Sequence, residues 1–321
     1  MANSATARAG ANIALVKYWG KRDARLNLPA AGSLSVTLAD LETVTTVTAA
    51  PELPGDRFFL NDLEVDAAPV SRVLDLLRSG DGPRCRVESR NSFPTGAGLA
   101  SSASGNAALV VAAAAVFGQD LDRRALSRVA RRGSGSAARS IFGGYCEMHA
   151  GVLDTGEDCY AEGLFEPDHW PLRVVVAITD SGPKAVSSRE GMNRTMASSP
   201  YYPAWVASVA SDLEHARRAV AGRDFEALVA VAESSALKMH ASALAAQPGL
   251  LYWNAATVAC LHRVRELRAQ GLGVFFTVDA GPQLKAVCLP GDAAEVASAL
   301  EAVPGVSRVL QTGLGAGAER L

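Results

Sequence analysis

Alternating apolar and small polar positions are the clearest pattern in the first half of the chain. Residues 33–48 alternate branched or apolar side chains with serine and threonine, which is typical of a strand with one buried face. Residues 58–66 predict a hairpin, and residues 85–89 predict a further short strand. Between them, residues 70–77 carry apolar side chains at helical spacing. The first half therefore predicts strands interrupted by a short helix.

A glycine-rich stretch follows the last of these strands and leads into a long alanine-rich helix. The stretch reads NSFPTGAGLASSASG over residues 91–105. Further helical segments are predicted at residues 121–132 and 138–142, each followed by glycines that end a helix. Residues 154–170 are acidic and irregular, and we place a domain junction there.

The second half of the chain has an element order that predicts a second domain. A strand, three helices, two strands, a helix and a strand are expected at residues 173–179, 203–220, 224–244, 251–270, 273–279, 284–289, 293–302 and 306–311. If the three helices form one layer, this is the β-α-β-β-α-β order of ferredoxin-like folds. We therefore expect an α+β chain with domains at residues 1–168 and 169–321.

The composition excludes several classes of protein. The chain has 321 residues, of which 49% are hydrophobic and 20% charged, and this length suits two folded domains. With 31 basic and 33 acidic residues, no global field attracts nucleic acid or an anionic membrane. An anionic ligand must therefore be held by a local cluster. The five cysteines are widely spaced and form no C-x-x-C pair, so neither a disulfide framework nor a zinc site is expected.

No segment of the sequence predicts a membrane span or an export signal. The longest apolar run, residues 107–117, has roughly half the length that a membrane-spanning helix needs. The first 16 residues contain one cation, Arg8, and continue directly into patterned sequence. We expect a cytoplasmic protein.

The glycine-rich loop before the alanine-rich helix is a candidate phosphate site. Backbone N–H groups at a helix N-terminus are unpaired and the helix dipole is positive there, so the turn suits a phosphate. Ser101 and Ser102 add hydroxyl donors or a Mg²⁺ ligand. The loop lacks the Gly-Lys-Ser/Thr of a Walker A motif. Judged alone, it is explained equally well by Ser101 as an N-cap and by glycines that form a tight turn.

A second loop of small residues, GSGSAARS at residues 133–140, repeats this chemistry. It supplies Ser134, Ser136 and Arg139, whose planar guanidinium suits two-point binding of a carboxylate or phosphate. The alternative is a solvated arginine that follows a basic helix. Two loops suited to anions within one domain favour binding.

Three other segments carry polar side chains next to apolar stretches. NIALVKYWGKRD contains Lys17, Tyr18 and Lys21, VDAGP contains Asp279, and DSGPKAVSSREGM contains Arg189. Each also has an ordinary explanation, as snorkelling lysines at a strand end, as a turn aspartate and as a flexible loop.

Taken together and in order, these segments resemble the diphosphomevalonate decarboxylase family of the GHMP kinase superfamily. The likeness extends from about residue 10 to residue 290 and is carried by NIALVKYWGKRD, LNLP with SLSVTL, NSFPTGAGLASSASG, ARRGSGSAARSIFGGY, SSREGM and DAGP. PTGAGLASS alone indicates only the superfamily, whereas KYWGKRD, GSGSAARS and DAGP indicate the decarboxylase branch. The resemblance implies a GHMP kinase two-domain fold, with an N-terminal ribosomal protein S5 domain 2-like unit and a ferredoxin-like C-terminal unit, and a homodimer.

The resemblance also implies an enzyme that uses ATP and Mg²⁺. Such an enzyme phosphorylates the tertiary 3-hydroxyl of mevalonate 5-diphosphate, a small-molecule substrate, and loss of phosphate and CO₂ then gives isopentenyl diphosphate. Asp279 is the implied base, Lys17 its neighbour, and Arg139 the group that holds the substrate carboxylate. The resemblance implies that the 5-diphosphate contacts Tyr18, Lys21, Ser134, Ser136 and Arg189, and that the carbon skeleton contacts Met192. It implies that ATP contacts Asn91, Gly96, Gly98, Ala100, Ser101 and Ser102. Ser101 and Ser102 are also the implied metal ligands.

Three departures from the family pattern bear on the substrate. The family has Asn-Ser-Ser before SVTL where this chain has Ala31, Gly32 and Ser33, Asn where it has Gln283, and PTAAG where it has Gly96. A phosphomevalonate decarboxylase or a mevalonate 3-kinase of the same family is therefore an alternative. A sensor that binds ligands without catalysis is a third possibility. The retained catalytic residues argue against the kinase and the sensor.

Overall fold

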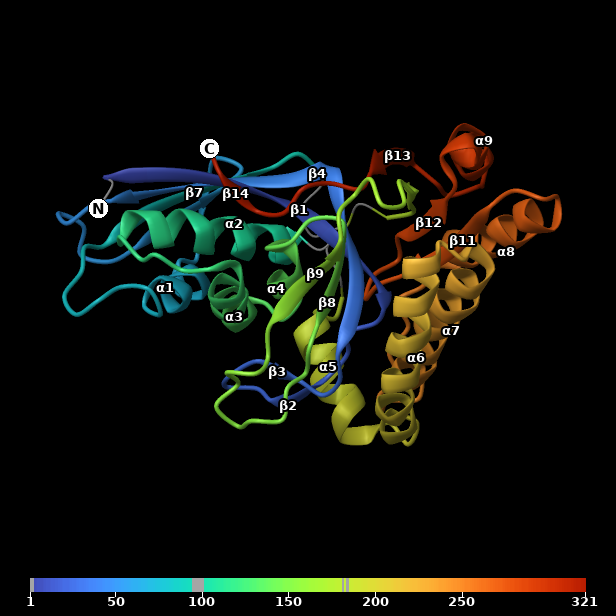
Figure 1. Cartoon of the computed structure of the whole chain (residues 1–321), viewed down its shortest axis with the longest axis horizontal. Helices are drawn as coiled ribbons and strands as arrows, with labels where there is room; N and C mark the ends of the chain where they lie inside the picture. Colours follow the sequence, from blue (N-terminus) through green and yellow to red (C-terminus); the bar gives the residue numbers. More distant parts are fainter. Residues whose placement is uncertain (1–2, 94–100, 181, 183–184) are drawn as a thin grey trace.

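The two halves of the chain form two sheets at opposite ends of the long axis of the molecule (Figure 1). The computed structural model describes residues 3–93, 101–180, 182 and 185–321. Both halves mix helices with strands, so the predicted α+β class is confirmed. Within these described ranges every helix is too short or too polar to cross a bilayer.

An eight-stranded sheet forms most of the N-terminal half. Its strands are β1 (Ser4–Val16), β4 (Ser33–Ala49), β5 (Arg57–Leu60), β6 (Leu63–Val65), β7 (Cys85–Asn91), β8 (Tyr145–Met148), β9 (Ala161–Phe165) and β14 (Glu319–Arg320). The main path runs β14-β1-β4-β7-β5-β6, and β8 pairs with both β4 and β9. Two short strands, β2 (Lys21–Asp23) and β3 (Leu28–Pro29), pair separately.

The predicted strands of this half are confirmed as β4, β5 with β6, and β7. Strands β8 and β9 were not predicted, and β1 was expected only as a strand end before Lys17. The last eight residues of β1 are all buried, because helices pack on both sides of it. A strand buried on both faces loses its alternating pattern. The expectation of irregular structure throughout residues 154–170 is wrong, since β9 lies within that range.

Within the described residues, four helices cover this first sheet: α1 (Ala68–Leu74), α2 (Ser101–Val116), α3 (Arg123–Gly133) and α4 (Ala137–Ser140). Helix α2 packs on β1 and β4 through alanines that are fully buried, such as Ala107 and Ala112. Small side chains let the helix lie close to the sheet. The GSGS segment between α3 and α4 is thereby brought beside the start of α2.

The second sheet has four antiparallel strands: β10 (Arg173–Ile178), β11 (Val274–Val278), β12 (Leu284–Cys288) and β13 (Arg308–Gly313). Their order is β11-β12-β10-β13. With helices between the first and second and between the third and fourth strands, this is the predicted ferredoxin-like order.

The part of the second half that the structure describes has five helices: α5 (Ser188–Ser198), α6 (Tyr202–Gly222), α7 (Phe225–Leu244), α8 (Ala255–Ala269) and α9 (Ala293–Glu301). A 3₁₀ turn, η1 (Pro290–Asp292), precedes α9. Helix α5 was not predicted. A signal for this helix was present in the sequence, because Ser187 is followed three residues later by Glu190. In the structure Ser187 caps the helix by accepting a hydrogen bond from the backbone N–H of Glu190.

A shared hydrophobic core joins the two sheets. It contains Leu15 and Val36 of the first sheet together with Val176 and Phe275 of the second. The chain also returns after β13, since Leu314 bridges to Leu38 and β14 pairs with β1. These contacts hold the two sheets together. The domain limits at residues 168 and 169 stay a prediction.

Candidate active site

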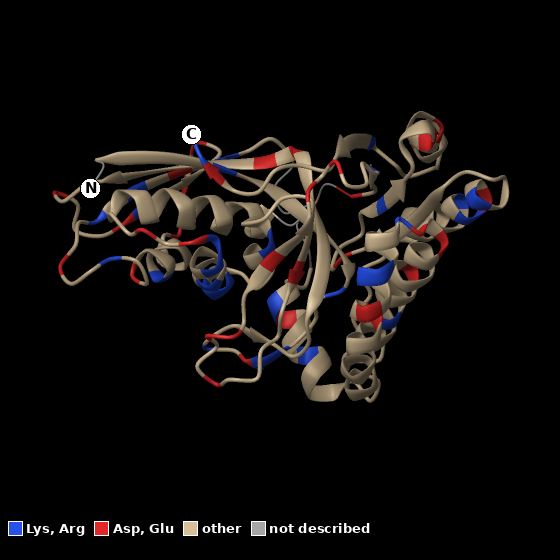
Figure 2. Cartoon of the chain, viewed as in Figure 1, with Lys and Arg blue, Asp and Glu red and all other residues tan. Residues whose placement is uncertain are grey.

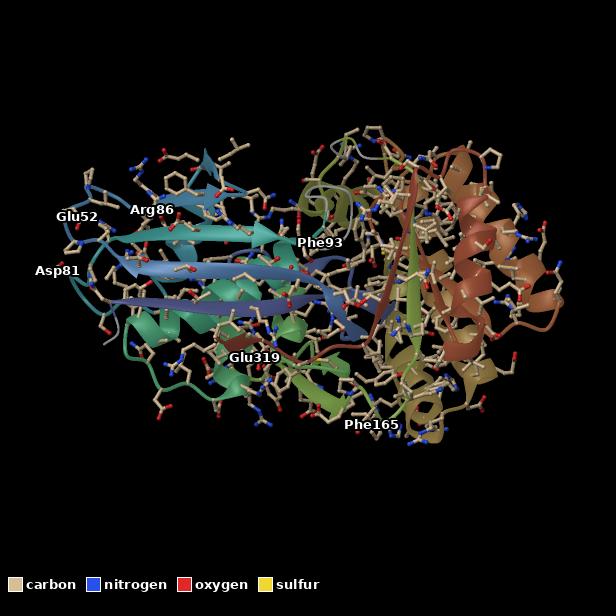
Figure 3. The ribbon with its side chains drawn as sticks, turned by 90° about the horizontal axis from the view of Figure 1, so that it is seen from above. Glu52, Asp81, Arg86, Phe93, Phe165 and Glu319 are labelled. Carbon is tan, nitrogen blue, oxygen red and sulfur yellow. The ribbon has the colours of Figure 1, made fainter. Side chains whose placement is uncertain are left out.

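Two cavities adjoin where the two sheets meet. The first has a volume of about 480 Å³ and the second about 590 Å³. Phe93, which follows β7, lies at the side of the first sheet that faces the second sheet (Figure 3). The residues that line both cavities are Lys21, Asn27, Ser101, Ser102, Gly133 and Arg189. A ligand in one cavity therefore lies next to a ligand in the other.

The first cavity brings together nearly all the predicted site residues that the structure describes. They come from both halves of the chain and are Lys17, Tyr18, Lys21, Ser101, Ser102, Ser134, Ser136, Arg139, Arg189, Met192 and Asp279. Asn91 lines the second cavity instead. Gly96, Gly98 and Ala100 lie outside the described residues.

An aspartate–lysine pair links the two halves of this cavity. Lys17 follows β1, Asp279 follows β11, and Lys17 Nζ lies 2.7 Å from Asp279 Oδ1. The backbone N–H of Lys17 donates to Ser235 Oγ at 3.0 Å, which fixes the end of β1 against α7. The Lys17 side chain is 1% exposed and that of Asp279 is 25% exposed. The ammonium is therefore almost fully buried, whereas the carboxylate is partly exposed to the cavity that both residues line.

The charges of this pair depend on burial and on each other. Burial lowers the pKa of Lys17 to about 8, although Asp279 favours the charged form. Burial alone would raise the pKa of Asp279, but Lys17 and Lys285 outweigh it and hold that pKa well below its usual range. Asp279 is therefore ionised at neutral pH.

Lys285 was missed by the sequence reasoning. It lies in β12, is fully buried, and places Nζ 3.3 Å from Asp279 Oδ2. A signal was available, because a lysine in the middle of the apolar strand LKAVC requires a buried partner.

Arg139 is a buried guanidinium held by neutral groups. It is 2% exposed, and its N–H groups donate to Ser35 Oγ at 2.9 Å, Ser33 Oγ at 2.5 Å and Asn12 Oδ1 at 3.0 Å. Within the described part of the chain no carboxylate lies within 4 Å of it, and burial lowers its pKa. A buried cation without an acidic partner is unfavourable unless an anion binds beside it. The three residues that orient Arg139 were not predicted.

A row of hydroxyl groups connects the two small-residue segments. Ser102 Oγ lies 3.4 Å from Ser134 Oγ, which lies 3.3 Å from Ser136 Oγ. The Tyr18 hydroxyl is buried and has no hydrogen-bond partner in the described structure. A side chain at Gly135 would meet that hydroxyl at 2.3 Å, so glycine is needed there. These hydroxyls are available to a ligand.

The first cavity has an excess of positive charge. Lys17, Lys21, Arg139 and Arg189 line it, whereas Asp279 is its one carboxylate in the described lining. Burial, and then Arg189, lower the pKa of Lys21. This local cluster exists in a chain of nearly balanced charge, whose acidic and basic residues are otherwise spread over both ends (Figure 2). The cavity therefore favours a ligand with several negative charges.

The second cavity is amphipathic. One part is apolar, with Phe58, Val70 and Leu109, and another carries Arg25, Arg72, Arg132, Lys21 and Arg189 without an acid among its described lining residues. Asn91, at the end of β7, accepts a hydrogen bond from Thr43 Oγ1 at 2.7 Å. An apolar pocket beside cations fits a nucleotide base beside its phosphates.

The residues present fit a magnesium ion bound mainly through phosphates. The described residues contain no group of three or more His, Cys, Asp or Glu that could form a protein cage. Mg²⁺ commonly takes few protein ligands and completes its shell with water and phosphate oxygens. The hydroxyls of Ser101 and Ser102 lie where the two cavities meet.

Three of the residues that depart from the family pattern, Ala31, Gly32 and Gln283, lie outside the described lining of both cavities, and Gly96 lies outside the described residues. A side chain at Gly32 would meet Leu213 Cδ1 at 2.8 Å and the Met148 carbonyl at 2.9 Å, so this position is filled by packing. Neither it nor Ala31 lines a cavity. Gln283 is buried, accepts a hydrogen bond from the Thr179 N–H at 2.6 Å and donates to the Asp180 carbonyl. Gln283 thus ties the end of β10 to the turn after Asp279.

Solved structures share this fold over almost the whole chain. The mevalonate diphosphate decarboxylase of Staphylococcus aureus has a TM-score of 0.93 and 36% identity, covering 100% of this chain and 98% of that one. A structure of MDDEF in complex with MVAPP, AMPPCP and magnesium has a TM-score of 0.92 and 38% identity, covering 99% and 98%. This chain therefore has the GHMP kinase fold.

Two family models match consecutive parts of the chain. Residues 9–161 match the diphosphomevalonate decarboxylase-like N-terminal domain, and residues 174–314 match the mevalonate 5-diphosphate decarboxylase C-terminal domain. The diphosphomevalonate decarboxylase of Candida albicans is 35% identical over 350 residues, covering 98% of this chain and 97% of that protein. The chain belongs to the diphosphomevalonate decarboxylase family, and the resemblance of its motifs is confirmed.

Proposed function

We propose that this protein catalyses the ATP-dependent decarboxylation of mevalonate 5-diphosphate to isopentenyl diphosphate, ADP, phosphate and CO₂. The observation that carries the proposal is the first cavity, which is lined by the partly exposed carboxylate of Asp279, by buried Arg139 and by the cations Lys21 and Arg189. A substrate with a hydroxyl, a carboxylate and a diphosphate matches these groups. MDDEF, solved in complex with MVAPP, AMPPCP and magnesium, supports the same ligand set.

In this proposal the Asp279 carboxylate accepts the proton of the 3-hydroxyl. A tertiary alcohol is a crowded nucleophile, so the site has to hold its oxygen in line with the γ-phosphate of ATP. Lys17, 2.7 Å from Asp279, compensates the charge of the carboxylate or of the phosphoryl group during transfer.

Arg139 holds the substrate carboxylate. Its orientation by Asn12, Ser33 and Ser35 keeps the guanidinium in one place while the substrate reacts. The bond to the carboxylate is then antiperiplanar to the departing phosphate, which lets CO₂ and phosphate leave together. Met192, which is 7% exposed in the cavity wall, packs on the carbon skeleton.

The 5-diphosphate binds to Tyr18, Lys21, Ser134, Ser136 and Arg189. These side chains offer two cations and three serine or tyrosine hydroxyls, more donors than one phosphate uses. The terminal phosphate adds roughly two charge-assisted bonds at about 1.5 to 3 kcal/mol each, which favours the diphosphate over the monophosphate by about a hundredfold or more.

ATP binds in the second cavity, with its base in the apolar part and its phosphates towards the shared residues. Asn91, Ser101 and Ser102 contact the nucleotide, as we propose for Gly96, Gly98 and Ala100 of the adjacent loop. When bound by Ser101, Ser102 and the phosphates, Mg²⁺ would offset the negative charge of the phosphates.

One assay tests the activity and the substrate together. The purified protein is incubated with ATP and, separately, with mevalonate, its 5-phosphate and its 5-diphosphate, while ADP and CO₂ are both measured. We expect both products from the 5-diphosphate. ADP and CO₂ from the 5-phosphate with an equal or higher kcat/KM would indicate a phosphomevalonate decarboxylase. ADP without CO₂ would indicate a 3-kinase. If neither ADP nor CO₂ forms from any of the three substrates, the result contradicts an enzyme of this family's type.

We also propose the predicted division into residues 1–168 and 169–321, a cytoplasmic location and a homodimer. The five cysteines are all free and buried, which suits a reducing compartment. Light scattering on the purified protein tests the homodimer, and limited proteolysis near residue 168 tests the division.

A further inference from the structure

We propose that Lys285 is a positioning residue that fixes the orientation of the Asp279 carboxylate towards the 3-hydroxyl. The proposal rests on the proposed function and adds a residue to it. Lys285 Nζ lies 3.3 Å from Asp279 Oδ2, and Lys17 Nζ lies 2.7 Å from Oδ1. Each oxygen of one carboxylate therefore has its own ammonium group.

Packing alone does not explain why a lysine stands at position 285. It lies in β12, between β10 and β11, where its cross-strand neighbours are Val176 and Thr277. The side chain is fully buried, and every other residue of β12 is apolar. A buried ammonium is strongly unfavourable unless it is paired, and an apolar residue would suit the strand better.

Lys285 acts on the reaction only through Asp279. It does not line the described walls of either cavity, whereas Lys17 and Asp279 both line the first. Asp279 is also the one member of the three that is exposed, at 25% against 1% and 0% for the lysines. Two cations at different oxygens oppose rotation of the carboxylate, which a single ion pair leaves possible.

The other charged or titratable groups that face Asp279 do not replace Lys285. They are Lys17 after β1, Arg139 on α4 and His240 on α7, and the first two are on the cavity side. His240 is neutral, because burial lowers its pKa to about 3, and its ring Nε2 lies 3.2 Å from the Val278 carbonyl. Loss of Lys285 would therefore leave Oδ2 without a cation behind it and raise the pKa of Asp279.

The test compares Lys285→Met with Lys285→Arg and a matched control. Met has a similar length without the charge, and Arg keeps the charge in a different geometry. The control, Lys238→Met, removes a lysine–aspartate pair of 2.6 Å between α7 and α6, and Lys238 lines neither cavity. Circular dichroism verifies the fold of each variant, and kcat, KM for both substrates and the pH profile of kcat are measured with the 5-diphosphate.

We expect Lys285→Met to lower kcat by about 10- to 100-fold, because the carboxylate loses its alignment, and to leave KM for ATP within about twofold. Its acid limb should move to higher pH by about one unit. Lys285→Arg should retain the acid limb of the wild type and lose less kcat than the Met variant. Lys238→Met should keep kcat within about twofold of the wild type.

Carboxylate ¹³C NMR gives a readout that does not need activity. The Asp279 signal, assigned with Asp279→Asn, should titrate at higher pH in Lys285→Met than in the wild type. Wild-type kcat and an unchanged acid limb in Lys285→Met would overturn the proposal, as would an unchanged Asp279 titration. If Lys285→Met does not fold, Lys285→Arg alone tests the proposal. An acid limb of Lys285→Arg that moves by about one pH unit, the shift expected for loss of the charge, would then overturn the proposal. A wild-type enzyme that releases no CO₂ contradicts the proposed function instead, and the NMR titration then decides on Lys285.

Discussion

The two adjoining cavities hold their charges in different ways. In the first, Lys17 and Arg139 are almost fully buried, and each is fixed by specific partners. In the second, Arg25, Arg72 and Arg132 are partly or fully exposed, and none has an ion pair within the described residues. Both cavities are rich in cations, so charge alone does not distinguish them.

The two cavities are therefore suited to different tasks. A buried charge is retained only where partners compensate its loss of hydration, and those partners also fix its position. Exposed arginines keep their hydration, move freely and attract an anion over a distance that salt screens. The first cavity therefore holds groups at fixed positions for a reaction, and the second collects and binds a charged ligand.

The largest expected effect comes from removing the carboxylate of the first cavity. Asp279→Asn should lower kcat by about a hundredfold to ten-thousandfold or more, because it removes both a proton acceptor and the partner of two lysines. ATP binding, measured by calorimetry, should stay nearly unchanged. Retention of more than about a tenth of wild-type kcat would make Asp279 a turn residue and remove the distinction between the cavities.

Arg139→Gln should have the next largest effect. Loss of a two-point, charge-assisted contact weakens binding of the acid by about 1.5 to 3 kcal/mol, and misalignment costs roughly a further hundredfold in rate. CO₂ release should therefore fall by more than the affinity for ATP. The measurement is kcat and KM for each substrate. A defect limited to KM for ATP would assign Arg139 to the second cavity.

The pH profile tests the buried lysine of the first cavity. Burial lowers the pKa of Lys17 to about 8, so the ammonium loses its proton as the pH rises through that value. If the charged form is required, kcat falls above pH 8 and reaches about a tenth of its maximum one pH unit higher. A profile that stays flat to pH 9.5 in a stable enzyme would contradict this role.

The smallest effect is expected in the second cavity. Arg132→Gln should raise KM for ATP by about three- to fivefold at low salt, because it removes one partly exposed cation. The difference from the wild type should shrink at about 0.5 M salt, where exposed charges are screened. An effect on kcat that persists at high salt would show that this cavity, too, holds fixed charges.

Much of the fold and many of the candidate site residues could be predicted from the sequence. Residues 33–48 have one face buried and the other partly exposed for much of their length, so the strand they form carries a period of two. The order of elements after residue 173 predicted the ferredoxin-like sheet. The candidate side chains lie in short motifs of glycine, serine and charged residues, which are visible without any contact between them.

Which of these groups contact one another depends on the tertiary structure. Lys17 follows β1, Lys285 lies in β12 and Asp279 follows β11, so the three residues belong to three different strands or strand ends. The separation of 262 residues between Lys17 and Asp279 leaves no local pattern. The same is true of Asn12, Ser33 and Ser35 around Arg139. β1 lost its alternating pattern because packing on both faces buries its final eight residues. Local sequence sets the backbone and the available chemistry, whereas burial and charge pairing arise from contacts between distant segments.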